Sequence, residues 1–155
     1  MNVPKTNMAK LSQALCILAC LFIAGCFDAK NEEWLAPDVT QKHLTEISSL
    51  TQIKLPEGTT GLAYFYVGSG RDDSLAAKLK IPAEKVNELL ANPIFKTGKD
   101  EHPGNGVGTH IDWWDVDTLS EPVHRTADLN SGSVLGCAFG KDGKDYILYI
   151  TWYEL

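Results

Sequence analysis

Val134-Leu-Gly-Cys-Ala-Phe139 and Tyr146-Ile-Leu-Tyr-Ile-Thr-Trp-Tyr153 are two runs of apolar, aromatic and β-branched residues near the end of the chain. Such residues favour β-strands. The connection between them, Gly140-Lys-Asp-Gly-Lys-Asp145, contains Asp142-Gly143, a dipeptide that favours a tight hairpin turn. The stretch therefore predicts a hairpin of two antiparallel strands. It also indicates that the sheet to which they belong is antiparallel.

A second hairpin is predicted upstream, from residues 61–67 and 75–81. The first run is largely apolar on both faces, with Leu62, Tyr64 and Tyr66 assigned to the same face, as expected of a covered strand. The second run alternates. Its inward residues are Leu75, Ala77, Leu79 and Ile81, and its outward residues are Lys78 and Lys80.

Helices and loops complete the predicted domain. A helix is expected over residues 38–50, with Asp38 as its cap, and another opens at Pro82, where a missing N–H is harmless. A strand is expected over 110–117, and irregular connections over 96–109 and 120–133. The sequence thus predicts an α+β fold, an antiparallel sheet of about five strands with one or two helices packed on one face.

Residues 1–25 have the three parts of an export signal. Lys5 and Lys10 make a positive start, an apolar run follows, and small residues precede Cys26. The apolar run is too short to span a bilayer comfortably. The predicted organisation is a leader over 1–25, a tether over 26–37 and a single domain over 38–155.

Ile23-Ala24-Gly25-Cys26 resembles the lipobox of bacterial lipoproteins. In that family the cysteine thiol receives a diacylglyceryl group, and the leader is cut just before it. The resemblance covers only the leader, and it implies that Cys26 is lipidated and that the membrane is a partner through that lipid. Ile17-Leu18-Ala19-Cys20 is a competing box, but it leaves a shorter apolar run and places a leucine where a small residue is usual.

The same resemblance implies a location. Two or three acyl chains attach a protein to a membrane almost permanently, whereas one chain binds only marginally. An acid directly after the cysteine is the inner-membrane retention signal of enteric bacteria, and here Phe27 precedes Asp28. The expected location is the periplasmic face of the outer membrane.

Charge and cysteine content exclude several classes of protein. The chain has 14 basic and 20 acidic residues, and without the two lysines of the leader the balance becomes 12 − 20 = −8. An acidic domain is repelled by nucleic acid, so nucleic-acid binding is not expected. Cys137 is the only cysteine of the predicted domain, which therefore has no internal disulfide, and its position between Leu135 and Phe139 predicts a buried, inert thiol.

The best candidate for chemistry is the run from His110 to Asp117, which also holds Asp112 and Asp115. A histidine and three acids could bind a hard cation or act as acid and base. On a strand, however, His110 and Asp112 share one face while Asp115 and Asp117 share the other. These four side chains are therefore weak metal-ligand candidates, and they converge only if a turn interrupts the strand.

Trp113 and Trp114 lie in the middle of the same run, flanked by Asp112 and Asp115. An exposed tryptophan beside acids is a suitable contact anchor for a protein or a sugar ring. The four residues are therefore the candidate binding surface. Burial of both tryptophans under the long loops is an equal alternative.

Three functions remain open on these observations. The first is a non-enzymatic, lipid-anchored envelope protein that binds an envelope protein or glycan and needs no cofactor. The second is an envelope hydrolase or metal-binding protein that uses the 110–117 cluster with His102 or His124. The third is a lipoprotein that stabilises an assembly. Convergence of the four ionisable side chains would favour the second.

Overall fold

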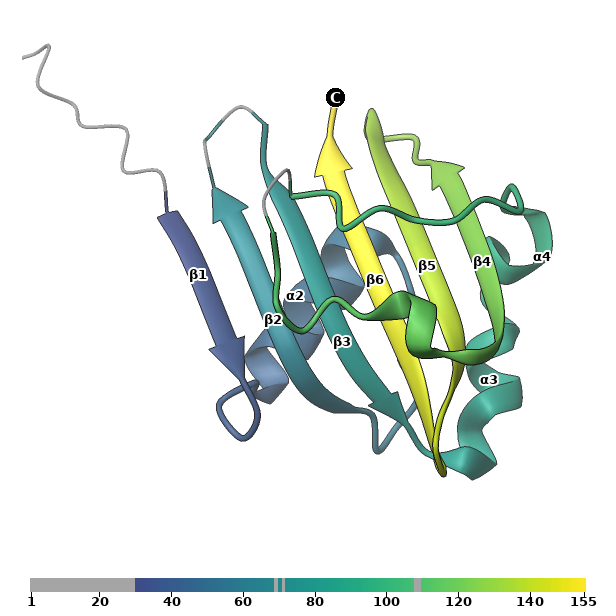
Figure 1. Cartoon of the computed structure of the whole chain (residues 1–155). Helices are drawn as coiled ribbons and strands as arrows, with labels where there is room; N and C mark the ends of the chain where they lie inside the picture. Colours follow the sequence, from purple (N-terminus) through teal and green to yellow (C-terminus); the bar gives the residue numbers. More distant parts are fainter. Residues whose placement is uncertain (1–29, 69, 71, 108–109) are drawn as a thin grey trace, which may run out of the picture.

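The computed structural model describes residues 30–68, 70, 72–107 and 110–155. They form a six-stranded antiparallel sheet, in the order β1-β2-β3-β6-β5-β4, with a few short helices (Figure 1). The strands are β1 (Lys30–Leu35), β2 (Thr60–Gly68), β3 (Ser74–Ile81), β4 (Ser120–Asp128), β5 (Ser133–Asp142) and β6 (Asp145–Glu154). The antiparallel sheet is as predicted, but the predicted count of about five strands is too low.

Both predicted hairpins are confirmed. In the β5–β6 hairpin Asp142 pairs with Asp145, which leaves a two-residue turn. Gly143 occupies the left-handed region there, with φ 60°. Such a φ angle strains other residues, so the glycine of the Asp-Gly pair is required by the backbone.

The β2–β3 hairpin differs from its prediction at one residue. The register shifts between Gly61 and Ala63, as in a β-bulge. Because of this shift, Leu62 packs against the small cluster that contains Val116, whereas Tyr64 belongs to the main core on the other face. The prediction that Leu62 and Tyr64 lie on the same face of the sheet is therefore wrong.

The sequence analysis missed the two strands at the edges of the sheet. β1 lies within the predicted tether, and β4 lies within the predicted irregular connection over 120–133. Edge strands bury less side-chain surface than central ones. Lys30-Asn-Glu-Glu-Trp-Leu35 and Ser120-Glu-Pro-Val-His-Arg-Thr-Ala-Asp128 accordingly carry many polar residues and no clear apolar alternation.

Conversely, the strand expected over residues 110–117 does not exist. A turn occupies Asp112 and Trp113, and a 3₁₀ helix, η2, covers Val116–Thr118. The side chains of Trp114, Val116 and Leu119 pack onto the sheet from this stretch, but its backbone does not pair as a strand.

The helices are α2 (Gln41–Thr51), η1 (Ala83–Lys85), α3 (Val86–Leu90) and α4 (Pro93–Thr97). The cap of α2 is Thr40 rather than Asp38, and the Thr40 N–H donates to His43 Nδ1 at 3.0 Å. Pro93 lies in the first turn of α4, where its missing N–H is harmless. None of these helices, within the described ranges, is long and apolar enough to cross a membrane.

The two faces of the sheet are covered by different structures. On one, the helix face, Ile47, Leu89 and Ile94 from the helices pack against strand residues such as Leu148. Cys137 is fully buried there, as predicted, and burial raises the pKa of its thiol. The other, the loop face, is crossed by residues 98–107 and 110–119, which lie between α4 and β4 and are called the crossing segment below (Figure 1).

The predicted leader and the lipidation site at Cys26 lie outside the described residues. The sheet begins before the predicted domain boundary at residue 38, because β1 starts at Lys30 and pairs with β2. The part of the predicted tether that precedes the sheet is therefore short, residues 26–29.

Candidate functional site

The crossing segment is held to the loop face at several points along its length. At its start, Lys99 exchanges two backbone hydrogen bonds with Thr126 of β4, at 2.8 and 2.9 Å. Further along, Pro103 is buried against Gly136, where an added Cβ would lie 2.8 Å from the proline Cβ. Gly136 thus lets the segment approach the backbone of the sheet closely.

Asp115 is the strongest polar attachment of the crossing segment. Its carboxylate accepts hydrogen bonds from Lys78 Nζ at 2.9 Å and from the Tyr149 hydroxyl. Burial would raise the pKa of Asp115, but these two hydrogen bonds and the lysine charge outweigh it, so the pKa is lowered. Lys78 was predicted to face solvent, yet only 15% of its side chain is exposed, because the segment covers it.

The four candidate ligands of the 110–117 cluster do not converge. His110 and Asp112 pair with each other at 3.1 Å on almost fully exposed side chains. Asp115 belongs to the Lys78 and Tyr149 contact, and Asp117 pairs with His102 at 3.2 Å. In the described residues, no group of three or more histidine, cysteine, aspartate or glutamate side chains is placed to hold a metal ion.

The two candidate tryptophans are both partly buried, so neither simple expectation holds. Trp114 packs edge-on against Tyr149, with 5.2 Å between ring centroids, and belongs to the small core of the loop face. Trp113 lies nearer the edge of the sheet, where its Nε1 donates to Glu33 of β1 at 3.1 Å. Trp113 and Asp112 therefore remain candidates for contact with a partner, whereas Trp114 and Asp115 attach the crossing segment.

His102 and His124 meet where the crossing segment passes over β4. Their rings pack edge to face with 4.5 Å between centroids. Nε2 of His124 is buried and has no hydrogen-bond partner in the described part of the chain. Burial and the charge of His102 lower the pKa of His124, although Asp100 and Asp117 act in the opposite direction.

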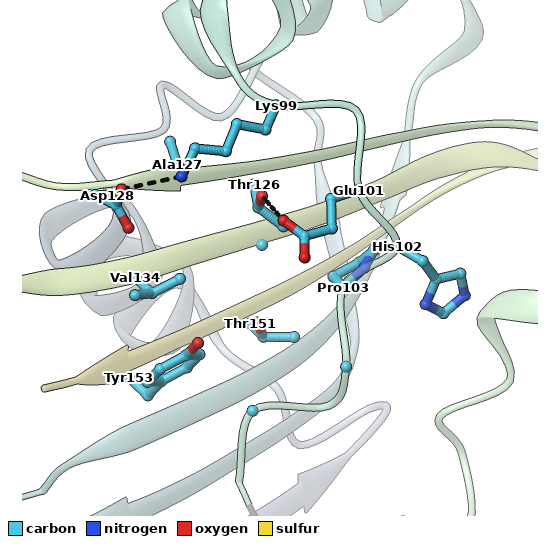
Figure 2. A pocket seen from close by; sticks show the side chains of 13 residues that line it. Lys99, Glu101, His102, Pro103, Thr126, Ala127, Asp128, Val134, Thr151 and Tyr153 are labelled. Atoms are coloured by element: carbon cyan, nitrogen blue, oxygen red, sulfur yellow. Dashed lines mark hydrogen bonds and ion pairs between the residues drawn. The ribbon is translucent and has the colours of Figure 1, made fainter.

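A cleft of about 470 Å³ opens between the first part of the crossing segment and the ends of β4, β5 and β6 (Figure 2). Residues 99–106 form one wall, and the floor is formed by strand residues. The polar side chains of the lining include Lys99, Glu101, Thr126, Asp128, Thr151 and Tyr153. The volume lies in the range of small-molecule sites, about 300–1,000 Å³.

Four polar side chains of the cleft form two pairs. Lys99 Nζ lies 3.2 Å from Asp128 Oδ2, and the Thr126 hydroxyl donates to Glu101 Oε2 at 3.0 Å, as Figure 2 shows. The Lys99 and Asp128 side chains are about 70% exposed. Exposed ion pairs are weak, so a ligand can exchange them at little cost.

Sequence reasoning missed this cleft. Its residues come from four segments of the sequence, near positions 100, 127, 135 and 152. One signal was present, because Gly136 interrupts an otherwise apolar strand, and such a glycine often marks the close approach of another backbone. The glycines at 104 and 106 were interpreted only as a flexible connection.

Comparisons of the chain with protein family models, curated proteins and solved structures give no match. Function is therefore inferred from the residues and the geometry described above.

Asp115→Asn should destabilise the fold, because it leaves the covered Lys78 amine without a charged partner. We expect a loss of about 1–3 kcal/mol in the free energy of unfolding, measured in urea. Asp112→Asn is the matched control, since the Asp112 side chain is 96% exposed, and it should change stability by less than about 0.5 kcal/mol. Equal stability of the two variants would contradict the attachment role of Asp115.

The His102–His124 contact predicts a stability that falls with acidification. The lowered pKa of His124 means that the unfolded chain takes up a proton more readily than the folded one. The free energy of unfolding should therefore fall as the pH drops below the ordinary histidine pKa of about 6.5. His124→Gln should reduce this fall, whereas His110→Gln, at an exposed position, should not. An unchanged pH dependence in His124→Gln would rule the explanation out.

Proposed function

We propose that this protein is a bacterial lipoprotein, attached through Cys26 to the periplasmic face of the outer membrane. The proposal is supported by the export signal and by the run Ile23-Ala24-Gly25-Cys26 that ends it. The sheet begins at Lys30, so the domain would lie within about 14 Å of the lipidated residue even on a fully extended chain. Such a domain works beside the membrane surface.

We further propose that the domain is a binding module rather than an enzyme, and that the cleft under the crossing segment is its ligand site. The single observation that carries this is the 470 Å³ cleft with both signs of charge at its mouth. The hydrolase or metal-protein alternative depended on the convergence of four side chains, and those side chains have separate partners.

The chemistry of the cleft suggests a short polar ligand. Lys99 and Asp128 offer one cation and one anion, Thr126 and Thr151 offer hydroxyls, and Tyr153 offers an aromatic ring on which a sugar or a peptide unit can pack. A glycan or short peptide of the envelope has the matching donors and acceptors.

Cys26→Ala tests the anchor. The parent chain should fractionate with membranes and carry acyl chains on the mass of its N-terminal peptide. The variant should be soluble or should keep its leader, because it lacks the thiol that receives the diacylglyceryl group. A Cys26→Ala chain that still fractionates as mature, acylated protein would disprove the anchor at this residue.

Site-specific photo-crosslinking tests the cleft. A photoreactive phenylalanine analogue in place of Tyr153 should crosslink an envelope peptide or glycan in intact cells. The same analogue in place of Lys144, in the exposed turn of the β5–β6 hairpin, is the control and should not. Capture of the same species from both positions, or from neither, would argue against the cleft as the ligand site.

A further inference from the structure

β1 is an edge strand with one unpaired side. It pairs with β2 from Lys30 to Leu35 without a register shift, and no described strand lies beyond it. An open edge presents a row of backbone donors and acceptors that can pair with another chain. The question is whether the structure protects this edge or leaves it available.

The direction of the backbone groups follows from the register. In an antiparallel pair, alternate residues bond to the partner strand and the others point away. The Ala36 N–H donates to Leu62 O at 2.9 Å, which places the even-numbered residues of β1 toward β2. Asn31, Glu33 and Leu35 therefore direct their backbone groups outward. Among backbone partners in the described residues, only the Leu35 carbonyl of this outward row is bonded, by the Asp38 N–H at 2.8 Å.

The opposite edge of the same sheet is protected in three ways. β4 has a register shift between Ser120 and Val123, it contains Pro122, and its outer side pairs with Lys99 of the crossing segment. Bulges, prolines and covering segments are the usual means of blocking an edge. In the described residues β1 has none of these three features. The β4 edge is therefore blocked, whereas the β1 edge is open.

The side chains around the β1 edge are apolar and acidic. Trp34 and Leu35 are 41% and 51% exposed, and only Leu155 joins them as an exposed large hydrophobic residue in the described ranges. Glu33 is exposed beside them and accepts a hydrogen bond from Trp113, and Glu32 precedes it on the strand. An added strand would thus meet one apolar residue on each face and acidic side chains.

This charge decides what can bind there. A second copy would bring its own β1 acids and its net negative charge toward the same patch. Like charges on paired strands are destabilising, whereas opposite charges stabilise the pair. We propose that the β1 edge binds an extended, cationic segment of another protein, which adds to the sheet as a seventh strand. Backbone pairing supplies the affinity, and Glu33 selects for lysine or arginine.

The remaining N-terminal chain does not compete for the edge if the leader is removed. Processing at Cys26 leaves residues 26–29 ahead of β1, too few to turn back and pair along it. This step alone rests on the proposed function. The fractionation of Cys26→Ala tests it separately from the binding experiment below, which measures the edge directly.

The test uses the full-length chain in a nonionic detergent and two labelled probes, a short peptide of alternating lysine and valine and its counterpart of alternating glutamate and valine. Fluorescence anisotropy should show binding of the lysine peptide and not of the glutamate peptide. Bound peptide should also protect the amides of Asn31 and Glu33 from hydrogen exchange, because those groups point outward.

Two substitutions separate the backbone from the charge. Asn31→Pro removes one outward N–H and leaves the bonds to β2, so the lysine peptide should lose affinity by about tenfold or more, while Asn31→Ala should bind like the parent. Glu33→Lys keeps the N–H and should reverse the preference between the peptides. Normal β2 amide protection in each variant shows that the sheet is intact.

Several outcomes would overturn the proposal. They are absence of lysine-peptide binding, equal binding of both peptides, or unchanged affinity in Asn31→Pro with an intact sheet. Self-association of the parent that disappears in Asn31→Pro would assign the edge to a second copy instead, and this would also overturn the cationic partner.

Discussion

The central strands β3 and β6 are buried on both faces, and the rest of the molecule depends on this constraint. A sheet with two apolar faces needs two covers. Short helices supply the first, but the second must come from chain without regular structure. The crossing segment serves this purpose through a small set of strong contacts, among which Asp115 joins a lysine from β3 and a tyrosine from β6. That contact lets a charged residue of β3 lie beneath the cover.

A cover made of loop leaves irregular space that a helix would have filled. Where residues 99–106 leave α4 and pass over the strand ends, Lys99 pairs with Thr126, and Pro103 and Gly106 approach the sheet closely, with open space between these contacts. The cleft is the result. Because Lys99 pairs with Asp128 and Thr126 with Glu101, a ligand that binds these groups gains only the difference between its own contacts and those it replaces. This favours ligands that present donors and acceptors together.

The central part of the fold could be predicted from the sequence, and the periphery could not. β5 and β6 are rich in apolar residues and joined by Asp-Gly, so local chemistry and tertiary position agree. The edge strand β1 and the loop at 110–117 show the opposite. Polar Lys30-Asn-Glu-Glu pairs because a neighbouring strand is present, whereas Trp113-Trp114 packs from a loop because the loop face needs covering. Both outcomes depend on residues far away in the sequence, which a local pattern does not contain.

The position of β6 has a consequence for when the sheet can close. The last strand of the chain lies between β3 and β5, so the pairing of Ser74–Ile81 with Asp145–Glu154 must wait until nearly the whole chain is available. Such non-local pairing is slow compared with a sequential hairpin. During synthesis, the amino-terminal part can form the β2–β3 hairpin before β6 is available, but it cannot complete the sheet. Under the proposed export, a domain that needs β6 to complete its sheet would stay unfolded enough to be threaded through a membrane.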